Sequence, residues 1–309
     1  MTHLLAVGGA HIDRRGRVDG DFVPGASNPG TMGEDVGGGS FNALRHVVRR
    51  GLSASLLSVR GGDYAGERVA SAIKAAGIMD LSAVFLDRAT PSYTALLDRD
   101  GDVIAALADM ALYELAFPKQ VRRAKLREAI FASDAVLCDT NLPAAALQRL
   151  LGLASGKPAF AIAISPAKAV RLADHLGGLS CLFMNRREAA ALSGGDGSLT
   201  KLMESLRVSG LARGVITQGA GPITGFDDSG LFAIDPPVPD SVMDVTGAGD
   251  ALAGATIAAL MRGSAFREAL REGVAAALLT IQAQVSVPDY SAGDFAAALA
   301  LVPQARKMT

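Results

Sequence analysis

Short apolar runs alternate with amphipathic stretches over most of the chain. The apolar runs, which predict buried strands, are residues 4–7, 54–59, 135–138, 160–164, 181–184 and 214–217. The amphipathic stretches, which repeat apolar residues at helical spacing, are residues 41–50, 65–76, 122–131, 143–151 and 187–192. Strands that alternate with helices in this way favour an α/β fold with a doubly wound, mainly parallel sheet flanked by helices.

Two segments depart from this alternation. Residues 14–36 are polar and rich in Gly and Pro, and residues 93–109 predict two strands, 94–97 and 103–107, around a turn that contains Asp100-Gly101. We expect approximately 14–36 and 91–110 to form a small β lid over one edge of the sheet. After Gly254 the pattern is mostly helical, and no repeat or linker is visible. The sequence therefore predicts a single α/β domain over residues 1–309 with this lid.

Composition and charge narrow the class of protein. Half of the 309 residues are apolar, which is enough for a sizeable core, and the net charge of −1 gives no electrostatic footprint for nucleic acid. Cys138 and Cys181 lie in apolar runs and are expected to be buried free thiols of a reducing compartment. The N-terminal apolar run is too short for a signal peptide, and no stretch is long enough to span a bilayer. We expect a cytoplasmic protein with no nucleic-acid or membrane partner.

The clearest chemical signal is the segment Asp244-Val245-Thr246-Gly247-Ala248-Gly249-Asp250, which a helical pattern follows. The glycines would then lie at a helix N-terminus, where unpaired amides and the helix dipole favour an anion. This is a seat for a phosphoryl group, and Asp250 beside it could accept the proton of an attacking hydroxyl. The simpler interpretation is that Asp250 caps the helix and the glycines form an ordinary loop.

Two other nucleotide-binding patterns do not fit. The Rossmann glycine fingerprint requires a third glycine at a different spacing after a first strand, whereas Gly254 is misplaced and the segment is near the C-terminus. A Walker A motif is also missing, because Pro158 follows Gly156-Lys157. If the protein uses ATP, it does not hold the phosphates with a P-loop.

The segment 244–250 resembles the C-terminal signature of the ribokinase-like (PfkB) carbohydrate kinases. Three more elements of that family precede this segment in the chain, in the family's order and at its spacing. They are Gly37-Gly38-Gly39-Ser40-Phe41-Asn42, then Asn185-Arg186-Arg187-Glu188, then Thr217-Gln218-Gly219. The chain is identified on this ordered set as a member of the family over nearly its whole length. The resemblance implies an ATP-dependent sugar kinase with a doubly wound sheet and a β lid.

The resemblance also implies roles for individual residues. Asp250 would be the catalytic base, and Gly247, Ala248 and Gly249 would form the anion hole. Asn185 and Glu188 would organise Mg²⁺ through water, while Asn185, Thr217, Gly219 and Thr246 would line the ATP site. Asp244 and Thr246 match positions near a site for a monovalent cation, such as K⁺, in some members. Asp13, Gly38 and Asn42 would bind sugar hydroxyls. By analogy with the family, we expect a homodimer formed through the lid.

Within the family, the chain is most similar to the pseudouridine kinases. The matching segments are 27–30, 92–93, 96–98 with 109–110, 139–141, and Ser165 with Lys168. This similarity implies that Asn28, Tyr93, Asp109 and Asn141 contact the substrate and that Lys168 meets phosphate. The implied reaction phosphorylates the 5′-hydroxyl of pseudouridine.

Departures from the pattern leave the substrate open. His11 replaces an Asn of the family, where it would contact substrate or lie exposed at the surface, and Ser40 replaces a common glycine. Ile162-Ala163 replace the Asp-Pro of the pseudouridine branch. A kinase of adenosine, guanosine, ribose or fructose is therefore an alternative, and so is a non-catalytic nucleotide or sugar sensor. The intact Asp250 and its glycines argue against the sensor.

Each predicted site residue also has a structural interpretation. Asp13 could belong to a turn, Asn42 could cap a helix, and Lys168 could be a solvated charge. Asn185 and Glu188 could be a helix cap and an exposed first-turn carboxylate. Asn28 could shape a Pro turn, Asp109 could end a strand, and Thr217 with Gly219 could form a tight turn.

Overall fold

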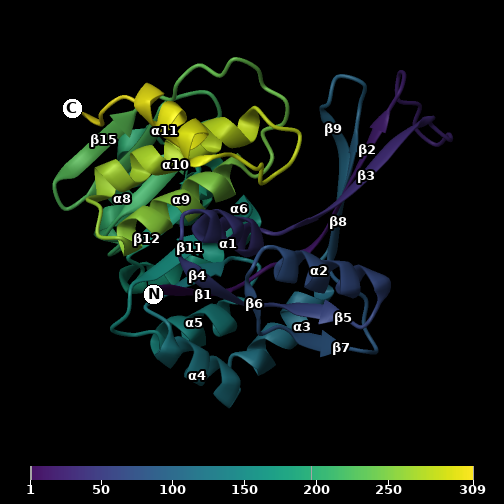
Figure 1. The fold of residues 1–309 in the computed structure, drawn as a ribbon, viewed down its shortest axis with the longest axis horizontal. Helices are drawn as coiled ribbons and strands as arrows, with labels where there is room; N and C mark the ends of the chain where they lie inside the picture. The colour runs from purple at the N-terminus through teal and green to yellow at the C-terminus, as the bar shows by residue number, and fades with distance from the viewer. Residues whose placement is uncertain (1, 196, 309) are drawn as a thin grey trace.

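The computed structural model describes residues 2–195 and 197–308, and a large sheet runs through its centre (Figure 1). The strand order is β16-β15-β14-β13-β12-β11-β10-β1-β4-β6. The parallel strands are β1 (His3–Val7), β4 (Ser53–Leu57), β6 (Met79–Asp80), β10 (Ala135–Asp139), β11 (Ala159–Ile162), β12 (Cys181–Asn185) and β13 (Gly214–Thr217). An antiparallel edge follows with β14 (Ile223–Asp227), β15 (Gly230–Ile234) and β16 (Arg306–Lys307). The predicted doubly wound, mainly parallel sheet is confirmed.

Alternate side chains of β1 enter two different cores, one on each face of the sheet. Leu4 and Ala6 belong to the core under α1 (Gly39–Arg49), α2 (Tyr64–Ala75), α9 (Ala248–Met261), α10 (Phe266–Ile281) and α11 (Ala292–Leu301). Leu5 and Val7 belong to the opposite core, under α3 (Ala111–Gln120), α4 (Ala124–Ala132), α5 (Ala144–Leu153) and α8 (Leu199–Val208). Both faces are covered, which explains why this strand is a continuous apolar run.

Helix α9 packs closely against α1, and small residues allow the approach. A Cβ on Gly254 would lie 2.4 Å from the carbonyl oxygen of Ala43, so only glycine fits there. Most of α9 is buried, including Ala251, Ala255 and Ala258. This packing brings the first turn of α9 to the first turn of α1, where the candidate site lies.

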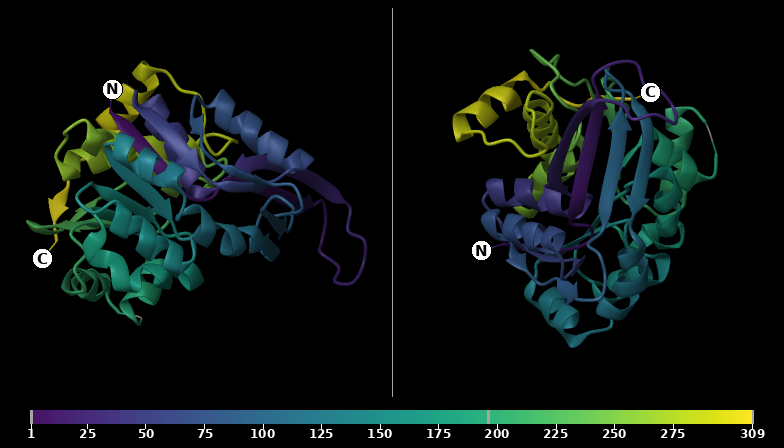
Figure 2. Two further views of the ribbon diagram at one scale, coloured as in Figure 1. Left: turned by 90° about the horizontal axis from the view of Figure 1, so that it is seen from below. Right: turned by 90° about the vertical axis from the view of Figure 1, so that its right-hand side faces the viewer.

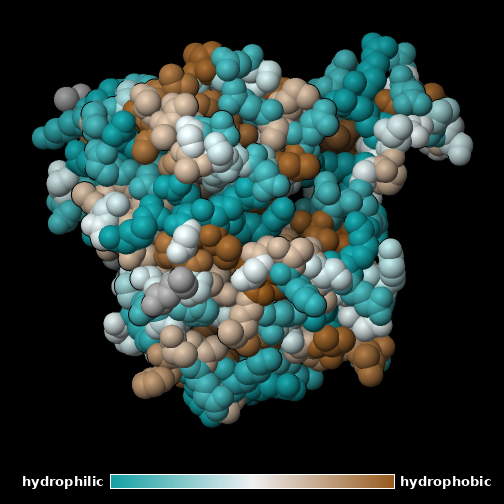
Figure 3. All heavy atoms as spheres, in the orientation of Figure 1, coloured by the Kyte–Doolittle hydropathy of each residue, from teal (hydrophilic) through white to brown (hydrophobic). Residues whose placement is uncertain are grey.

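A second sheet, which we call the lid sheet, projects from the body beside α2 (Figures 1 and 2). Its order is β3 (Gly30–Gly37), β2 (His11–Val18), β8 (Ser92–Leu97) and β9 (Val103–Asp109). The predicted strands 94–97 and 103–107 are confirmed with slightly longer bounds, and the polar segment 14–36 contains most of the β2–β3 hairpin. On the face shown in Figure 3, apolar residues are scattered among hydrophilic ones across the molecule.

Other expectations were met in part. The expected strand 54–59 is divided at Ser58 into β4 and β5 (Val59–Gly61), and β5 pairs with β7 (Ala83–Phe85). The remaining short elements are α6 (Pro166–Ala169), a 3₁₀ segment (Val170–Gly178) and α7 (Arg186–Ser193). Cys138 and Cys181 are buried free thiols, as predicted. None of the helices within the described ranges combines the length and the apolar character needed to cross a membrane.

Candidate active site

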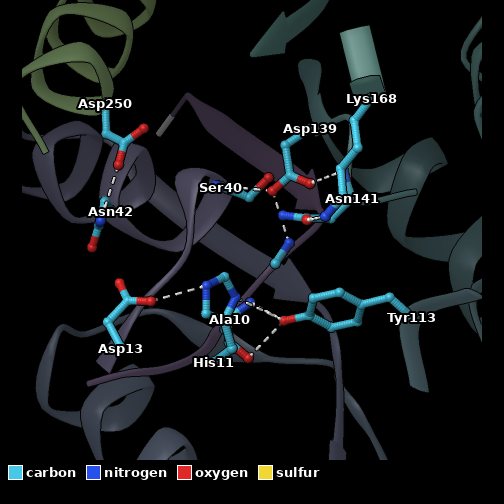
Figure 4. A network of polar contacts seen from close by, with 11 residues as sticks. Ala10, His11, Asp13, Ser40, Asn42, Tyr113, Asp139, Asn141, Lys168 and Asp250 are labelled. Carbon is cyan, nitrogen blue, oxygen red and sulfur yellow. Dashed lines mark hydrogen bonds and ion pairs between the residues drawn. The ribbon is translucent and has the colours of Figure 1, made fainter. Parts of the chain in front are cut away.

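Polar residues from distant segments meet where parallel strands end and two helices begin (Figure 4). The loops after β1 and β10 and the junction of β12 with α7 lie at this edge of the sheet, together with the N-termini of α1 and α9. Binding sites of doubly wound sheets lie at the carboxyl ends of the strands. The site is therefore expected at this edge on fold grounds, independently of any motif.

Asn42 and Asp250 form the closest link between the two helices. Asn42 Nδ2 donates to Asp250 Oδ2 over 2.9 Å. Helix α1 begins after Gly38 without a side-chain cap, so the interpretation of Asn42 as a cap is wrong. Asn42 Oδ1 is buried and has no partner among the described residues. It remains an acceptor for a hydroxyl of a ligand.

The surroundings of Asp250 raise the pKa of its carboxyl group. Burial raises the pKa of Asp250 to about 7, the hydrogen bond from Asn42 opposes this, and the charges of Asp139, Asp13 and Glu188 raise it further. Helix α9 begins after Gly247, so Asp250 lies in its first turn and does not cap it. A carboxylate with a pKa near neutral is a competent proton acceptor.

The glycines before Asp250 have separate structural reasons. Gly247 adopts a left-handed conformation with φ of 81°, and a Cβ there would lie 2.7 Å from the carbonyl oxygen of Ser286. Gly249 has no atom within 4 Å of a Cβ position and faces open space. The first amides of α9 lack intrahelical acceptors, so the segment 247–249 offers a helix N-terminus that a ligand can approach closely.

A cavity of about 120 Å³ joins the predicted base to the predicted nucleotide residues. Its lining includes Asn185, Glu188, Thr217, Gly249 and Asp250. The cavity also touches Ile162 and Ala163, the pair that departs from the pseudouridine branch. The structure thus brings residues from three of the four sequence motifs onto one cavity. Gly219 is not among its lining residues and lies in the turn after β13 with φ of 62°.

Asn185 and Glu188 form a reciprocal helix cap. Asn185 Oδ1 accepts from the Glu188 amide over 3.0 Å, and Glu188 Oε2 accepts from the Asn185 amide over 2.7 Å. The cap interpretation is therefore correct, but the expectation of an exposed carboxylate is wrong, because Glu188 is only 4% exposed. Burial raises the pKa of Glu188 to about 7, against the hydrogen bonds from Asn185.

This donor set fits Mg²⁺ held indirectly. No group of three or more His, Cys, Asp or Glu side chains that could hold a metal occurs within residues 2–195 and 197–308. Glu188 uses one carboxylate oxygen in the cap, which leaves the other for a water molecule. Mg²⁺ usually keeps several waters and takes few protein carboxylates together with substrate phosphates.

Asp244 is bound from two sides. Its Oδ1 accepts from the Thr246 amide over 2.8 Å, and its Oδ2 lies 2.5 Å from Arg15 Nη1 of the lid sheet. Burial acts to raise the pKa of Asp244, but the hydrogen bonds from Thr246 and the charge of Arg15 outweigh it and lower the pKa. A monovalent cation predicted at Asp244 would thus share this carboxylate with Arg15.

The predicted sugar-binding residues lie at the base of the lid sheet. Asp13 is in β2, not in a turn, and His11 Nε2 lies 3.2 Å from Asp13 Oδ1. His11 Nδ1 lies 3.2 Å from the hydroxyl of Tyr113, so His11 is buried, and the expectation of surface exposure is wrong. Gly38 has φ of 116°, and a Cβ there would lie 2.4 Å from the carbonyl oxygen of Gly9.

A buried carboxylate organises the floor of the site. Asp139 Oδ2 accepts from the amides of Gly9 and Ser40 over 2.8 and 3.1 Å, and Asp139 Oδ1 accepts from the amide of Asn141 over 2.9 Å. The side chain of Asp139 has no exposed surface. It ties the loops after β1 and β10 to the start of α1.

Asn141 and Lys168 lie together beside this floor (Figure 4). Lys168 Nζ donates to Asn141 Oδ1 over 2.7 Å, so Lys168 is not a solvated helix charge. Burial lowers the pKa of Lys168, and Asp139 opposes this effect. Asn141 Nδ2 is buried without a partner among the described residues, which leaves a donor for a ligand.

The predicted lid residues are not all near the site. Tyr93 is paired with Asp13 across β8 and β2. Asp109 is exposed and is paired with Ser92, which is paired in turn with Ile12 at the base of the lid sheet. Asn28 lies in the loop between β2 and β3. Within the described part of the chain its side chain forms hydrogen bonds only with its own loop, at Val23 and Ala26. In this arrangement Asn28 shapes a turn.

Three residues of this region received no role from the sequence. Asp139 has a visible signal, because it is the charged end of an apolar strand. Arg15 alternates with Asp13 on β2, but a strand was not predicted there. Tyr113 has no signal: its hydroxyl donates to the carbonyl oxygen of Ala10 from helix α3, a contact between distant segments.

Comparisons with known proteins agree with this geometry. The model of the pfkB family carbohydrate kinases matches residues 1–289. Over 274 residues, 87% of each protein, the chain is 29% identical to a pseudouridine kinase from Escherichia coli strain K12. A carbohydrate kinase structure from Agrobacterium tumefaciens matches with a TM-score of 0.87 and 48% identity over 99% of both chains. Ribokinase from Arabidopsis thaliana, complexed with ribose and ATP, matches in fold with a TM-score of 0.85 and 20% identity, over 97% of this chain and 99% of that one.

Proposed function

The chain belongs to the pfkB family of carbohydrate kinases and is an ATP-dependent kinase, and we propose that its acceptor is the 5′-hydroxyl of pseudouridine. The observation that carries the site assignment is the Asn42–Asp250 pair beside the glycines of α9. It joins a hydroxyl-binding amide, a proton acceptor and an anion seat within one turn of each helix.

The proposed reaction uses these groups in fixed roles. The acceptor oxygen attacks the γ-phosphorus of ATP, the bond from that phosphorus to the β–γ bridging oxygen breaks, and Asp250 takes the hydroxyl proton. The amides of 247–249 hold the charged phosphoryl oxygens at the N-terminus of α9. Mg²⁺ near Asn185 and Glu188 would neutralise charge on the ATP phosphates. Such transition states are loose, so positioning of the two reactants carries much of the rate.

The acceptor would lie between the floor and the base of the lid sheet. Asp13, Asn42 and the amide region of Gly38 offer groups for ribosyl hydroxyls. The unpaired Asn141 Nδ2 offers a donor for a carbonyl oxygen of a uracil ring. Lys168, which donates to Asn141 Oδ1, keeps its predicted role of meeting phosphate. The Asn141 donor and the 29% identical relative support pseudouridine over a plain sugar.

Further features of the proposal concern the whole protein. We infer that the lid sheet covers the acceptor and that residues 1–309 act as one domain. A homodimer through the lid sheet is supported by Met32, Leu96 and Leu107, which share one face of it and are 61%, 37% and 71% exposed. Use of K⁺ and a cytoplasmic location stay predictions.

The test is ADP release from Mg-ATP with a panel of pseudouridine, uridine, adenosine, guanosine, ribose and fructose. We expect turnover with pseudouridine and at least tenfold lower kcat/KM with the others, about 1.4 kcal/mol of discrimination. Turnover with another member and none with pseudouridine would refute the substrate. ATP binding without turnover on any member would favour the sensor.

A further inference from the structure

Arg15 connects the lid sheet to the loop that leads into helix α9. Side chains at alternate positions of a strand share a face, so Arg15 lies on the same side of β2 as His11 and Asp13. Its Nη1 lies 2.5 Å from Asp244 Oδ2, and the two side chains are 28% and 26% exposed. The pair joins residues 229 positions apart in the chain.

The loop that receives Arg15 has few other buried contacts. Ser241, Val242, Met243 and Val245 are all exposed. The main chain is held by bonds from the amides of residues 243 and 244 to the carbonyl oxygen of Ile281, at 2.8 and 3.4 Å. Segments with little buried surface open at a low cost in free energy. The charge-assisted bond between Arg15 and Asp244 therefore contributes much of the stability of this loop.

Asp244 passes this constraint to the glycine segment. Its second carboxylate oxygen accepts from the amide of Thr246, the residue before Gly247. One carboxylate therefore connects a lid strand on one side with the start of the anion seat on the other. Movement of β2 would change the position of Asp244 and, through Thr246, that of the first amides of α9.

We propose that Arg15 is a positioning residue that couples the placement of the lid sheet to the geometry of the phosphate seat at 247–249. The inference rests on the proposed role of that seat. Its consequence is that the seat reaches its working geometry when the lid sheet is in place, so that ATP is not spent on water while the acceptor site is open.

The experiment compares Arg15→Ala, Arg15→Lys and Asp244→Asn with the control Arg17→Ala. Arg17 lies two residues further along the same face of β2 and makes no ion pair among the described residues. The first readout is hydrogen–deuterium exchange of amides 241–249 in the protein without ligand. The second is kcat/KM for the best acceptor, with ADP release in the absence of acceptor measured in parallel.

We expect faster exchange at 241–249 in Arg15→Ala, a decrease in kcat/KM of about tenfold, and a larger share of ADP released without acceptor. Arg15→Lys should recover part of each effect, and Arg17→Ala should match the wild type. Arg15→Ala combined with Asp244→Asn should be no worse than Asp244→Asn alone, since both remove the same bond.

Unchanged exchange at 241–249 in Arg15→Ala, or additive effects in the double variant, would overturn the coupling. Far-ultraviolet circular dichroism and the thermal midpoint check that each variant folds. Because the exchange readout needs no substrate, the two proposals fail separately. If exchange is fast in Arg15→Ala but the wild type turns over no acceptor, the coupling through Arg15 is supported and the proposed function is rejected.

Discussion

Asn42 donates a 2.9 Å hydrogen bond to Asp250 across the interface of α1 and α9. The two residues are 208 positions apart in the sequence. The bond favours the ionised form of Asp250, whereas burial and nearby carboxylates favour the neutral form. The balance leaves Asp250 able to exchange a proton near neutral pH.

The substitution Asp250→Asn should remove the proton acceptor and keep the shape of the site. We expect kcat to fall by about 10²–10⁴-fold, because general-base contributions are of this size. The dissociation constant of ATP should stay within about threefold of the wild type, since the amides of 247–249 are retained. Steady-state kinetics and calorimetric titration of ATP measure the two effects. Near-normal turnover would show that Asp250 is not the base.

The pH dependence of activity should report the same carboxyl group. The pKa of Asp250 is raised from 3.8 to about 7, so the ionised base accumulates as the pH rises through 7, and kcat/KM for the acceptor should rise with it. Asn42→Leu removes the hydrogen bond that lowers this pKa, so its profile should shift to higher pH. Initial rates at saturating ATP, measured from roughly pH 5 to pH 9, give the profiles of the wild type and of Asn42→Leu. Identical profiles for the two proteins would contradict the assignment.

The raised pKa of Asp250 also affects stability, which should fall with rising pH although activity rises. The folded-state pKa is above the unfolded value, so the folded state binds the extra proton between pH 4 and 7, and stability falls as the pH rises through this window. Asp250→Asn should therefore raise the free energy of unfolding above pH 7, by about 2 kcal/mol after allowance for solvent in the cavity. The gain should vanish below pH 4. Urea unfolding at pH 4 and pH 8 measures the difference, and an equal effect at both would contradict the shift.

Asp139 should be a structural residue of the site. Asp139→Ala leaves the amides of Gly9, Ser40 and Asn141 without their acceptor, which should cost about 3 kcal/mol of unfolding free energy. Glu128→Ala, on the exposed side of α4, is the control and should lie within about 0.5 kcal/mol of the wild type. Denaturant unfolding of both variants gives the comparison. A loss below about 1 kcal/mol for Asp139→Ala would contradict the role.

The central sheet could be predicted because its parallel strands are covered on both faces and are therefore continuous apolar runs. β1 and β12 appear at the expected residues for this reason. The antiparallel strand β14 was missed because Thr224 and Gly225 interrupt its apolar pattern. β15 was missed although Leu231–Ile234 is a short apolar run like those of the predicted strands. The strand β2 was missed as well, since His11–Val18 carries charges on both faces.

The site could be predicted where its chemistry is local in sequence. The glycines before Asp250 belong to one short segment, and Asn185 and Glu188 belong to another. The structure places Gly249, Asp250, Asn185 and Glu188 on one cavity. The contacts of Asn42 with Asp250 and of Arg15 with Asp244 depend on how distant segments pack. The same holds for the hydroxyl of Tyr113, which reaches Ala10 only through the docking of α3.

Gly247 and Gly249 should respond differently to substitution, because Gly247 is required by the backbone and Gly249 by the ligand. Gly247→Ala forces a side chain onto a residue with φ of 81° and against the carbonyl oxygen of Ser286, so it should destabilise the protein by about 2 kcal/mol. Gly249→Ala meets no atom within 4 Å and lies in a helix, where Ala is favoured by roughly 0.5–1 kcal/mol, so stability should be kept or raised.

The substitution Gly249→Ala should lower activity although it does not lower stability. The open space beside it is where a phosphoryl group would approach the amides of α9, and a methyl group there would keep the ligand away. We expect Gly249→Ala to lose at least about tenfold in kcat/KM for ATP while its thermal midpoint does not fall. Thermal unfolding and ADP release on the same preparation measure both. A fully active Gly249→Ala enzyme would place the phosphoryl group elsewhere, because a contact between backbone and ligand leaves no room for the added carbon.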